Sequence, residues 1–276
     1  MVSPRERERA RARTRVTGPE ARPKKPKKPK TVHGHGHVHV YGKKKPSSGR
    51  PKLVPKDQAL AAFAKLSAHH HDAHCELDHV TPFQLLCATV LSAQSTDVMV
   101  NKVTPGLFAA YPDAKSMAAA TTLEIEALVN RLGMFRQKSK SLVGLSQKLV
   151  ADHDGQVPRT LPELVKLPGV GRKTANVVLG VCFGNPEGVV VDTHVQRISQ
   201  RLGWTKNTDP ADIEQDLCKL LPRDQWDRAS HVLIFHGRRI CDAQKPDCKA
   251  CPVAELCPSA GKAEKIGRKP PRQRPR

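Results

Sequence analysis

The segment LPELVKLPGVGRKTANVVLGVCF (residues 161–183) constrains the fold of this chain most strongly. Its apolar residues recur at helical spacing on both sides of a Pro-Gly-Val-Gly turn. Proline stops the first helix and Gly169 accepts a positive φ, so the chain turns sharply before Arg172 begins the second helix. Thr160 and Glu163 form a capping-box pattern in front of the first helix. The sequence therefore predicts two helices joined by a glycine hairpin.

A hairpin of this kind exposes backbone N–H groups at Gly169, Val170 and Gly171, beside the positive end of the second helix. That combination is typical of a phosphate site. Lys173 lies in the first helical turn, where the helix dipole disfavours a cation and so favours the neutral amine. A neutral lysine can attack a carbonyl-like carbon and form a Schiff base. The alternative is a solvated surface lysine.

Asp192 follows the apolar run Val189–Val191 and precedes a predicted helix over 193–202. The expected structural role is an N-cap, worth about 1 kcal/mol. A capping carboxylate is also fixed in place, so it can face a positive charge or a proton-transfer partner without reorganising. The sequence thus offers Lys173 and Asp192 as candidate reactive groups.

Four cysteines near the C-terminus have the spacing C-x6-C-x2-C-x5-C and are accompanied by three prolines. Four thiolates in so short a loop predict a metal site, and the spacing alone allows either zinc or a [4Fe–4S] cluster. The chain shows no secretory signal and no membrane-length apolar run, so we expect ligation rather than disulfides. The proposed ligands are Cys241, Cys248, Cys251 and Cys257.

The net charge of +21 is concentrated at the two ends of the chain. Residues 1–56 carry a net charge of +15 and residues 259–276 carry +6, whereas 57–258 contain 22 charges of each sign. We therefore expect disordered basic tails over 1–53 and 259–276 that either bind nucleic-acid phosphates or act as solubilising segments. Any nucleic-acid site in the central part must be a local patch.

The motifs LPGVGRKTANVVLG and VDTHV resemble those of the endonuclease III family, the helix-hairpin-helix DNA glycosylases, and the likeness runs from about Val54 to Pro258. The resemblance implies that Lys173 is the catalytic nucleophile and Asp192 its essential partner. It also selects a [4Fe–4S] cluster over zinc for the four cysteines. A glycosylase of this kind flips a damaged nucleotide out of the duplex.

The resemblance also implies which residues contact DNA. Gln94, in the polar break LSAQSTD, matches a residue that fills the space left by the extruded base. Met134 matches a wedge position where the family usually has leucine, although covering the core is its ordinary role. The remaining expected DNA contacts are Gly169, Val170, Gly171, Arg172 and, more weakly, His194.

The resemblance implies an all-α architecture with two domains. A six-helix domain over 77–185 includes the hairpin, and an iron–sulfur cluster domain combines 54–76 with 186–258. DNA is expected in the cleft between them. Helical periodicity independently supports the all-α class. The predicted core of the first domain includes Leu123, Ile125, Leu128 and Val129.

Two further local features are interpreted from the sequence. Thr81 is predicted to cap a buried helix that has Pro82 in its first turn. The histidine-rich run His69–His74 is interpreted as a solvated helix end rather than a metal site.

The implied function is excision of oxidised pyrimidines followed by strand cleavage through β-elimination. The partner is double-stranded DNA with damaged bases or abasic sites, and we expect a cytoplasmic, nucleoid-associated monomer without membrane contact, nuclear only in a eukaryote. One alternative is an adenine-mismatch glycosylase, a class that lacks a lysine at the position of Lys173. The other is a non-catalytic helix-hairpin-helix DNA-binding protein.

Overall fold

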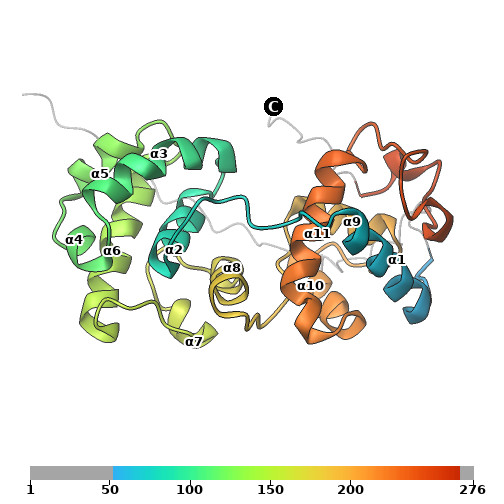
Figure 1. Ribbon diagram of the computed structural model, residues 1–276, viewed down its shortest axis with the longest axis horizontal. Helices are drawn as coiled ribbons and strands as arrows, with labels where there is room; N and C mark the ends of the chain where they lie inside the picture. The colour runs from blue at the N-terminus through green and yellow to red at the C-terminus, as the bar shows by residue number, and fades with distance from the viewer. Residues whose placement is uncertain (1–51, 268–276) are drawn as a thin grey trace, which may run out of the picture. The chain divides into compact units, whose positions relative to one another are not determined.

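The computed structural model describes residues 52–267, and the regular elements in that part of the chain are helices (Figure 1). The rest of the expected tails, 1–51 and 268–276, lies outside the described residues. In the described part, no helix has both the length and the apolar character needed to cross a membrane. The all-α expectation is therefore confirmed.

Helices α2 to α8 build the first hydrophobic core. The longest of them, α6, packs against α4 and α5, while α2 packs against both α6 and α8 (Figure 1). The buried residues of this core lie between Leu77 and Leu179 in the sequence. In chain order the helices are α2 (Pro82–Leu91), α3 (Asp97–Ala110), α4 (Ala114–Ala118), α5 (Thr122–Val129), α6 (Phe135–His153), α7 (Leu161–Leu164) and α8 (Arg172–Phe183).

The second hydrophobic core combines the N-terminal helix with the C-terminal helices. α11 packs against both α9 and α1. The described residues belong to one compact unit, within which the two cores are separate clusters. The α-helices of this core are α1 (Lys56–His69), α9 (Thr193–Arg201), α10 (Pro210–Leu220) and α11 (Trp226–Arg239).

Contacts between the two cores position the site described below. α8 of the first core packs against α11 of the second. The Arg172 guanidinium, at the start of α8, donates from Nη2 and Nε to the carboxylate of Glu214 on α10, at 2.7 and 3.1 Å to Oε1. The hairpin is thereby tied to the second core.

The caps at helix starts are mostly those that the sequence predicts. The Thr81 hydroxyl accepts from the backbone N–H of Gln84, and Pro82 occupies the first helical position, so this prediction is confirmed. The capping box at Thr160 is wrong, because the Thr160 side chain makes no capping hydrogen bond to the backbone of α7. The Thr160 hydroxyl instead donates to the Glu163 carboxylate at 2.5 Å.

Three expectations about burial are also wrong. Leu123 is 76% exposed, because a residue two positions before the buried Ile125 lies on the opposite side of α5. The C-terminal tail does not begin at residue 259, since Ala263 and Ile266 are buried. The histidine run is not a fully solvated helix end, because His70 is only 1% exposed.

Candidate functional site

A pocket of about 250 Å³ brings Lys173 and Asp192 together. Lys173 comes from the first turn of α8, in the first core, and Asp192 immediately precedes α9, in the second. Asp97 from the start of α3 and Asp227 from α11 line the same pocket. The two residues that sequence reasoning selected as reactive therefore share one pocket, although they belong to different cores.

The hairpin presents the N-terminus of α8 without side-chain cover. Gly169 has φ +77°, and a Cβ there would lie 2.7 Å from Ser141 Cβ, so both the backbone and the packing require glycine. Gly171 is the N-cap of α8, makes no side-chain cap, and has open space where a Cβ would stand. Nothing in the described residues requires glycine at 171, but its bare backbone leaves room for an anion to approach the helix dipole.

Asp192 is fixed by the backbone of α9. Its Oδ1 accepts hydrogen bonds from the backbone N–H groups of His194 and Val195, each at 2.8 Å. The predicted N-cap is therefore confirmed. Both of these bonds use one carboxylate oxygen, so capping leaves the other available to the pocket.

Asp97 is the pocket residue that sequence reasoning missed. Burial raises the pKa of its carboxyl group, the nearby Asp192 carboxylate raises it further, and Lys173 opposes the shift. The three charges thus interact within one pocket. The sequence signal was the capping residue Thr96 in the polar break, which places an aspartate in the first turn of α3.

Arg238 closes one side of the pocket by ion pairs across the two cores. Its guanidinium pairs with the Glu76 carboxylate and donates from Nη2 to Asp97 Oδ2 at 3.0 Å. Arg239, the next residue, makes a two-point contact with the Asp72 carboxylate at 2.8 and 2.9 Å. Both arginines are therefore bonded within the protein.

Gln94 and Met134 share an uncommon backbone conformation. Their φ values are +55° and +58°, and among the described residues only Asp154 is a further non-glycine residue with positive φ. Met134 is 53% exposed, and Gln94 is also exposed. A Cβ on Gly133 would lie 3.7 Å from the Gln94 carbonyl oxygen, so the two loops are neighbours. Such conformations concentrate at functional sites.

A buried lysine joins these two loops. Lys138 is 4% exposed and donates from Nζ to Ser95 Oγ at 2.8 Å. Burial lowers the pKa of Lys138. Ser95 follows Gln94, and Lys138 lies one helical turn after Met134. This bond therefore fixes the positions of the Gln94 and Met134 backbones relative to each other.

The other expected contact residues are placed as follows. Val170 is buried and its N–H donates to the Leu167 carbonyl within the turn, so the expectation of an exposed N–H at this residue is wrong. The Arg172 side chain is 54% exposed despite its pairing with Glu214. His194 is half-buried, and its Nδ1 lies 3.1 Å from Arg197 Nη2.

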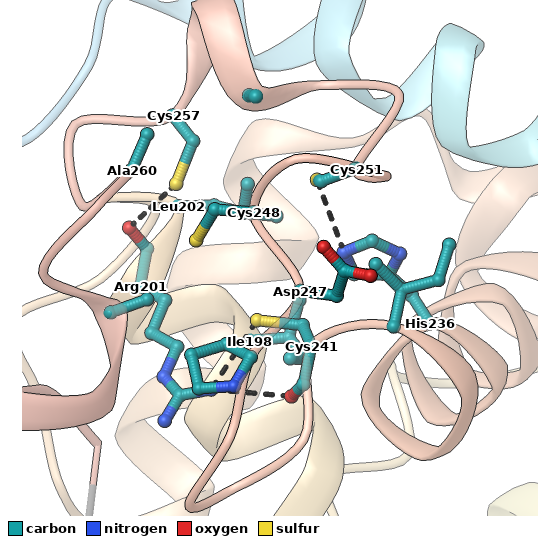
Figure 2. A pocket seen from close by; sticks show the side chains of 14 residues that line it. Ile198, Arg201, Leu202, His236, Cys241, Asp247, Cys248, Cys251, Cys257 and Ala260 are labelled. Atoms are coloured by element: carbon teal, nitrogen blue, oxygen red, sulfur yellow. Dashed lines mark hydrogen bonds between the residues drawn. The ribbon is translucent and has the colours of Figure 1, made fainter.

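The four C-terminal cysteines line a second pocket together (Figure 2). Burial raises the pKa of Cys257 to about 11 and raises that of Cys251. The Arg201 guanidinium donates to Cys241 Sγ at 3.3 Å. In the described part of the chain, no group of three or more ligating side chains converges closely enough for a single metal ion.

The chain is similar to known DNA repair proteins over most of its length. Residues 87–223 match the HhH-GPD superfamily base excision DNA repair protein family. The chain is 53% identical over 205 residues to endonuclease III of Synechocystis sp., covering 74% of this chain and 94% of that protein. It is 45% identical over 196 residues to endonuclease III of Bacillus subtilis, covering 71% and 89%.

Two solved structures are similar over nearly their whole length. One is a trapped endonuclease III–DNA covalent intermediate, with TM-score 0.71, 42% identity, and coverage of 77% of this chain and 99% of that one. The other is a non-covalent endonuclease III–DNA complex, with TM-score 0.71, 42% identity, and coverage of 77% and 98%.

Proposed function

The chain belongs to the endonuclease III family of base excision DNA repair proteins, and from this premise we propose that Lys173 is its nucleophile and oxidised pyrimidines are its substrates. The chain is accordingly a DNA glycosylase and abasic-site lyase. The observation that carries the proposal is the pocket in which Lys173 meets the fixed carboxylate of Asp192. A relative trapped as a covalent intermediate with DNA supports a covalent route.

The proposed reaction begins with a nucleotide flipped into this pocket. The Lys173 amine, once it has given up a proton, attacks C1′ of the sugar, and the damaged base leaves with the electrons of the glycosidic bond and takes up a proton. The amine loses a proton, and opening of the sugar ring gives a Schiff base between Nζ and C1′. Loss of a proton from C2′ then expels the 3′ phosphate, which cuts the strand. Asp192 accepts the amine proton or stabilises the positive charge that develops on the sugar.

DNA contacts follow from the exposed groups around the pocket. We propose that the Gly169–Gly171 turn grips a phosphate, and that Gln94 and Met134 enter the stack that the flipped base leaves. Their exposure and left-handed backbone support this role. Arg172 and His194 are proposed as weaker DNA contacts, because each already bonds within the protein.

The domain division is proposed on the same grounds. The first domain is 77–185 and the second combines 54–76 with 186–258, in keeping with two separate hydrophobic cores. DNA lies across the pocket to which both contribute. The protein is proposed to act as a monomer on double-stranded DNA.

We also propose that Cys241, Cys248, Cys251 and Cys257 hold a [4Fe–4S] cluster. The donor chemistry fits, because four thiols line one pocket and each corner iron of such a cube takes one thiolate. Arg201 supports the assignment. Its guanidinium is buried, and in the described residues no carboxylate pairs with it, so an anionic cluster would balance its charge. When bound, the cluster ties the loop into a fixed shape.

Borohydride trapping on an abasic duplex tests the nucleophile. The wild-type protein and a Lys65→Ala control, which removes an exposed lysine on α1, should form a stable covalent adduct. Lys173→Ala should form none, and an undiminished adduct in that variant would refute the assignment.

Duplexes with oxidised pyrimidines, and one with adenine opposite oxidised guanine, separate the proposed substrate from that of a mismatch glycosylase. Iron and sulfide analysis tests the cluster, and stoichiometric zinc would overturn it.

A further inference from the structure

Two histidines from opposite ends of the sequence meet in the second core. His70 ends α1 as its C-cap and His236 lies in the last turn of α11, and each is only 1% exposed. His70 Nε2 lies 3.1 Å from His236 Nδ1, and the rings pack edge to face. Burying an imidazole costs free energy unless its ring nitrogens are hydrogen-bonded, so each nitrogen in this contact should have a partner.

The second nitrogen of His236 faces a cysteine. His236 Nε2 lies 3.7 Å from Cys251 Sγ, as the dashed line in Figure 2 shows. A metal-bound thiolate is a hydrogen-bond acceptor and has no hydrogen to give. His236 must therefore carry its hydrogen on Nε2, and a neutral ring then has only a lone pair on Nδ1.

The lone pair on His236 Nδ1 fixes the tautomer of His70. Only a hydrogen on His70 Nε2 can satisfy the 3.1 Å contact, so His70 donates to His236. Both rings are buried in the second core, where burial disfavours the charged form. His70 thus donates to His236, and His236 donates to the Cys251 sulfur.

We propose that His70 and His236 form a hydrogen-bond relay from α1 to the Cys251 sulfur, with His236 as a positioning residue for the iron–sulfur cluster. The relay rests on the cluster proposed above. A hydrogen bond to a cluster thiolate withdraws electron density from sulfur and so raises the reduction potential. It also fixes the ligand in the orientation that the metal requires.

Other contacts hold the relay in place. Arg228 of α11 donates to the backbone carbonyls of His70, Ser67 and Ala73, at 2.8, 3.2 and 2.6 Å, which fixes the end of α1. Gln58 Nε2 donates to the Leu256 carbonyl in the cysteine loop at 2.9 Å. α1 is therefore joined to the cysteine loop directly and through α11. Of these connections, the histidine relay is the one that reaches a proposed cluster ligand, Cys251.

The test compares three variants of the full-length protein purified with its cluster. His236→Leu removes the donor to Cys251, and His70→Leu removes the group that orients it. His70→Gln keeps an amide N–H near the position of Nε2 and is the matched control. Iron content, the reduction potential by protein-film voltammetry, and the rate at which a chelator removes iron are measured for each.

We expect the potential to fall most in His236→Leu, less in His70→Leu, and little in His70→Gln. Iron retention should weaken about 10- to 100-fold in His236→Leu. Nitrogen-15 NMR of the wild-type protein should show hydrogen on Nε2 of both rings. If His236→Leu fails to fold, the difference between the two His70 variants decides.

The outcomes separate the relay from the cluster. Equal potentials in a loaded wild-type protein and in both leucine variants would overturn the relay, as would hydrogen on Nδ1 of His236. A wild-type protein that contains no iron would overturn the cluster assignment and the relay together. Trapping of abasic DNA by Lys173 is a separate measurement that neither result decides.

Discussion

Replacing each hairpin glycine by alanine should give opposite results. In Gly169→Ala, the new Cβ would lie 2.7 Å from Ser141 Cβ and the residue would keep φ near +77°. The left-handed conformation costs about 1 to 2 kcal/mol for a residue with a side chain. Overpacking adds about 1 to 3 kcal/mol. The free energy of unfolding should therefore fall by about 2 to 5 kcal/mol.

Gly171→Ala is the matched control for folding. Gly171 has φ −95°, and a Cβ there meets nothing within 4 Å. Alanine is a poorer N-cap than glycine, but it lowers the entropy of the unfolded chain, and these two opposing effects are each about 1 kcal/mol. Stability should stay within about 0.5 kcal/mol of wild type. The methyl group instead occupies the space through which a phosphate would approach the N–H groups of α8.

Thermal unfolding and DNA binding distinguish the two effects. Gly169→Ala should lower Tm by about 4 to 20 °C, on the scale of 2 to 4 °C per kcal/mol for a domain of this size. Gly171→Ala should keep its Tm and lose about 10- to 100-fold in affinity for duplex DNA, because charge-assisted hydrogen bonds are worth about 1.5 to 3 kcal/mol. Wild-type affinity in Gly171→Ala would refute the hairpin as a phosphate site. Wild-type Tm in Gly169→Ala would refute the packing argument.

Four further variants test the pocket, the Gln94 loop and the buried histidine pair. Asp192→Asn should unfold within about 0.5 kcal/mol of wild type, since asparagine caps as well as aspartate, yet lose about 10²- to 10⁴-fold in excision rate. Lys138→Met should weaken DNA binding without loss of denaturant stability, because it frees the Gln94 loop but removes a buried ammonium, and Ser95→Ala should weaken binding less. His70→Gln should flatten the pH dependence of stability. In the wild type, His70 binds a proton below about pH 6.5 in the unfolded state but only below about pH 4 in the folded state. The free energy of unfolding therefore decreases as the pH falls from about 6.5 to about 4, and it should decrease less in His70→Gln.

Local rules explain what the sequence predicts well. The glycine hairpin and the caps at Thr81 and Asp192 each depend on residues within about four positions. Backbone sterics and hydrogen-bond capacity decide such features with little help from the rest of the fold. The exception is Thr160, whose hydroxyl prefers a neighbouring carboxylate to the helix backbone.

Long-range partners explain what the sequence does not reveal. His70 and His236 are 166 positions apart, and Arg238 and Asp97 are 141 apart. The histidine-rich composition suggests solvent exposure, whereas the helical spacing indicates burial. His70 follows Leu66 by four positions and His236 follows Val232 by four, so each continues a buried helix face.

The pocket depends on how the two cores are held together. Lys173 and Asp192 are each fixed at the start of a helix, but the two helices belong to different cores. The bridging ion pairs of Arg238 and Arg172 are partly exposed, and such pairs contribute only about 0 to 1 kcal/mol to stability. Their effect lies in geometry instead, because a shift of about 1 Å between reacting groups can cost about 10²-fold in rate. These ion pairs thus serve to align the two halves of the pocket.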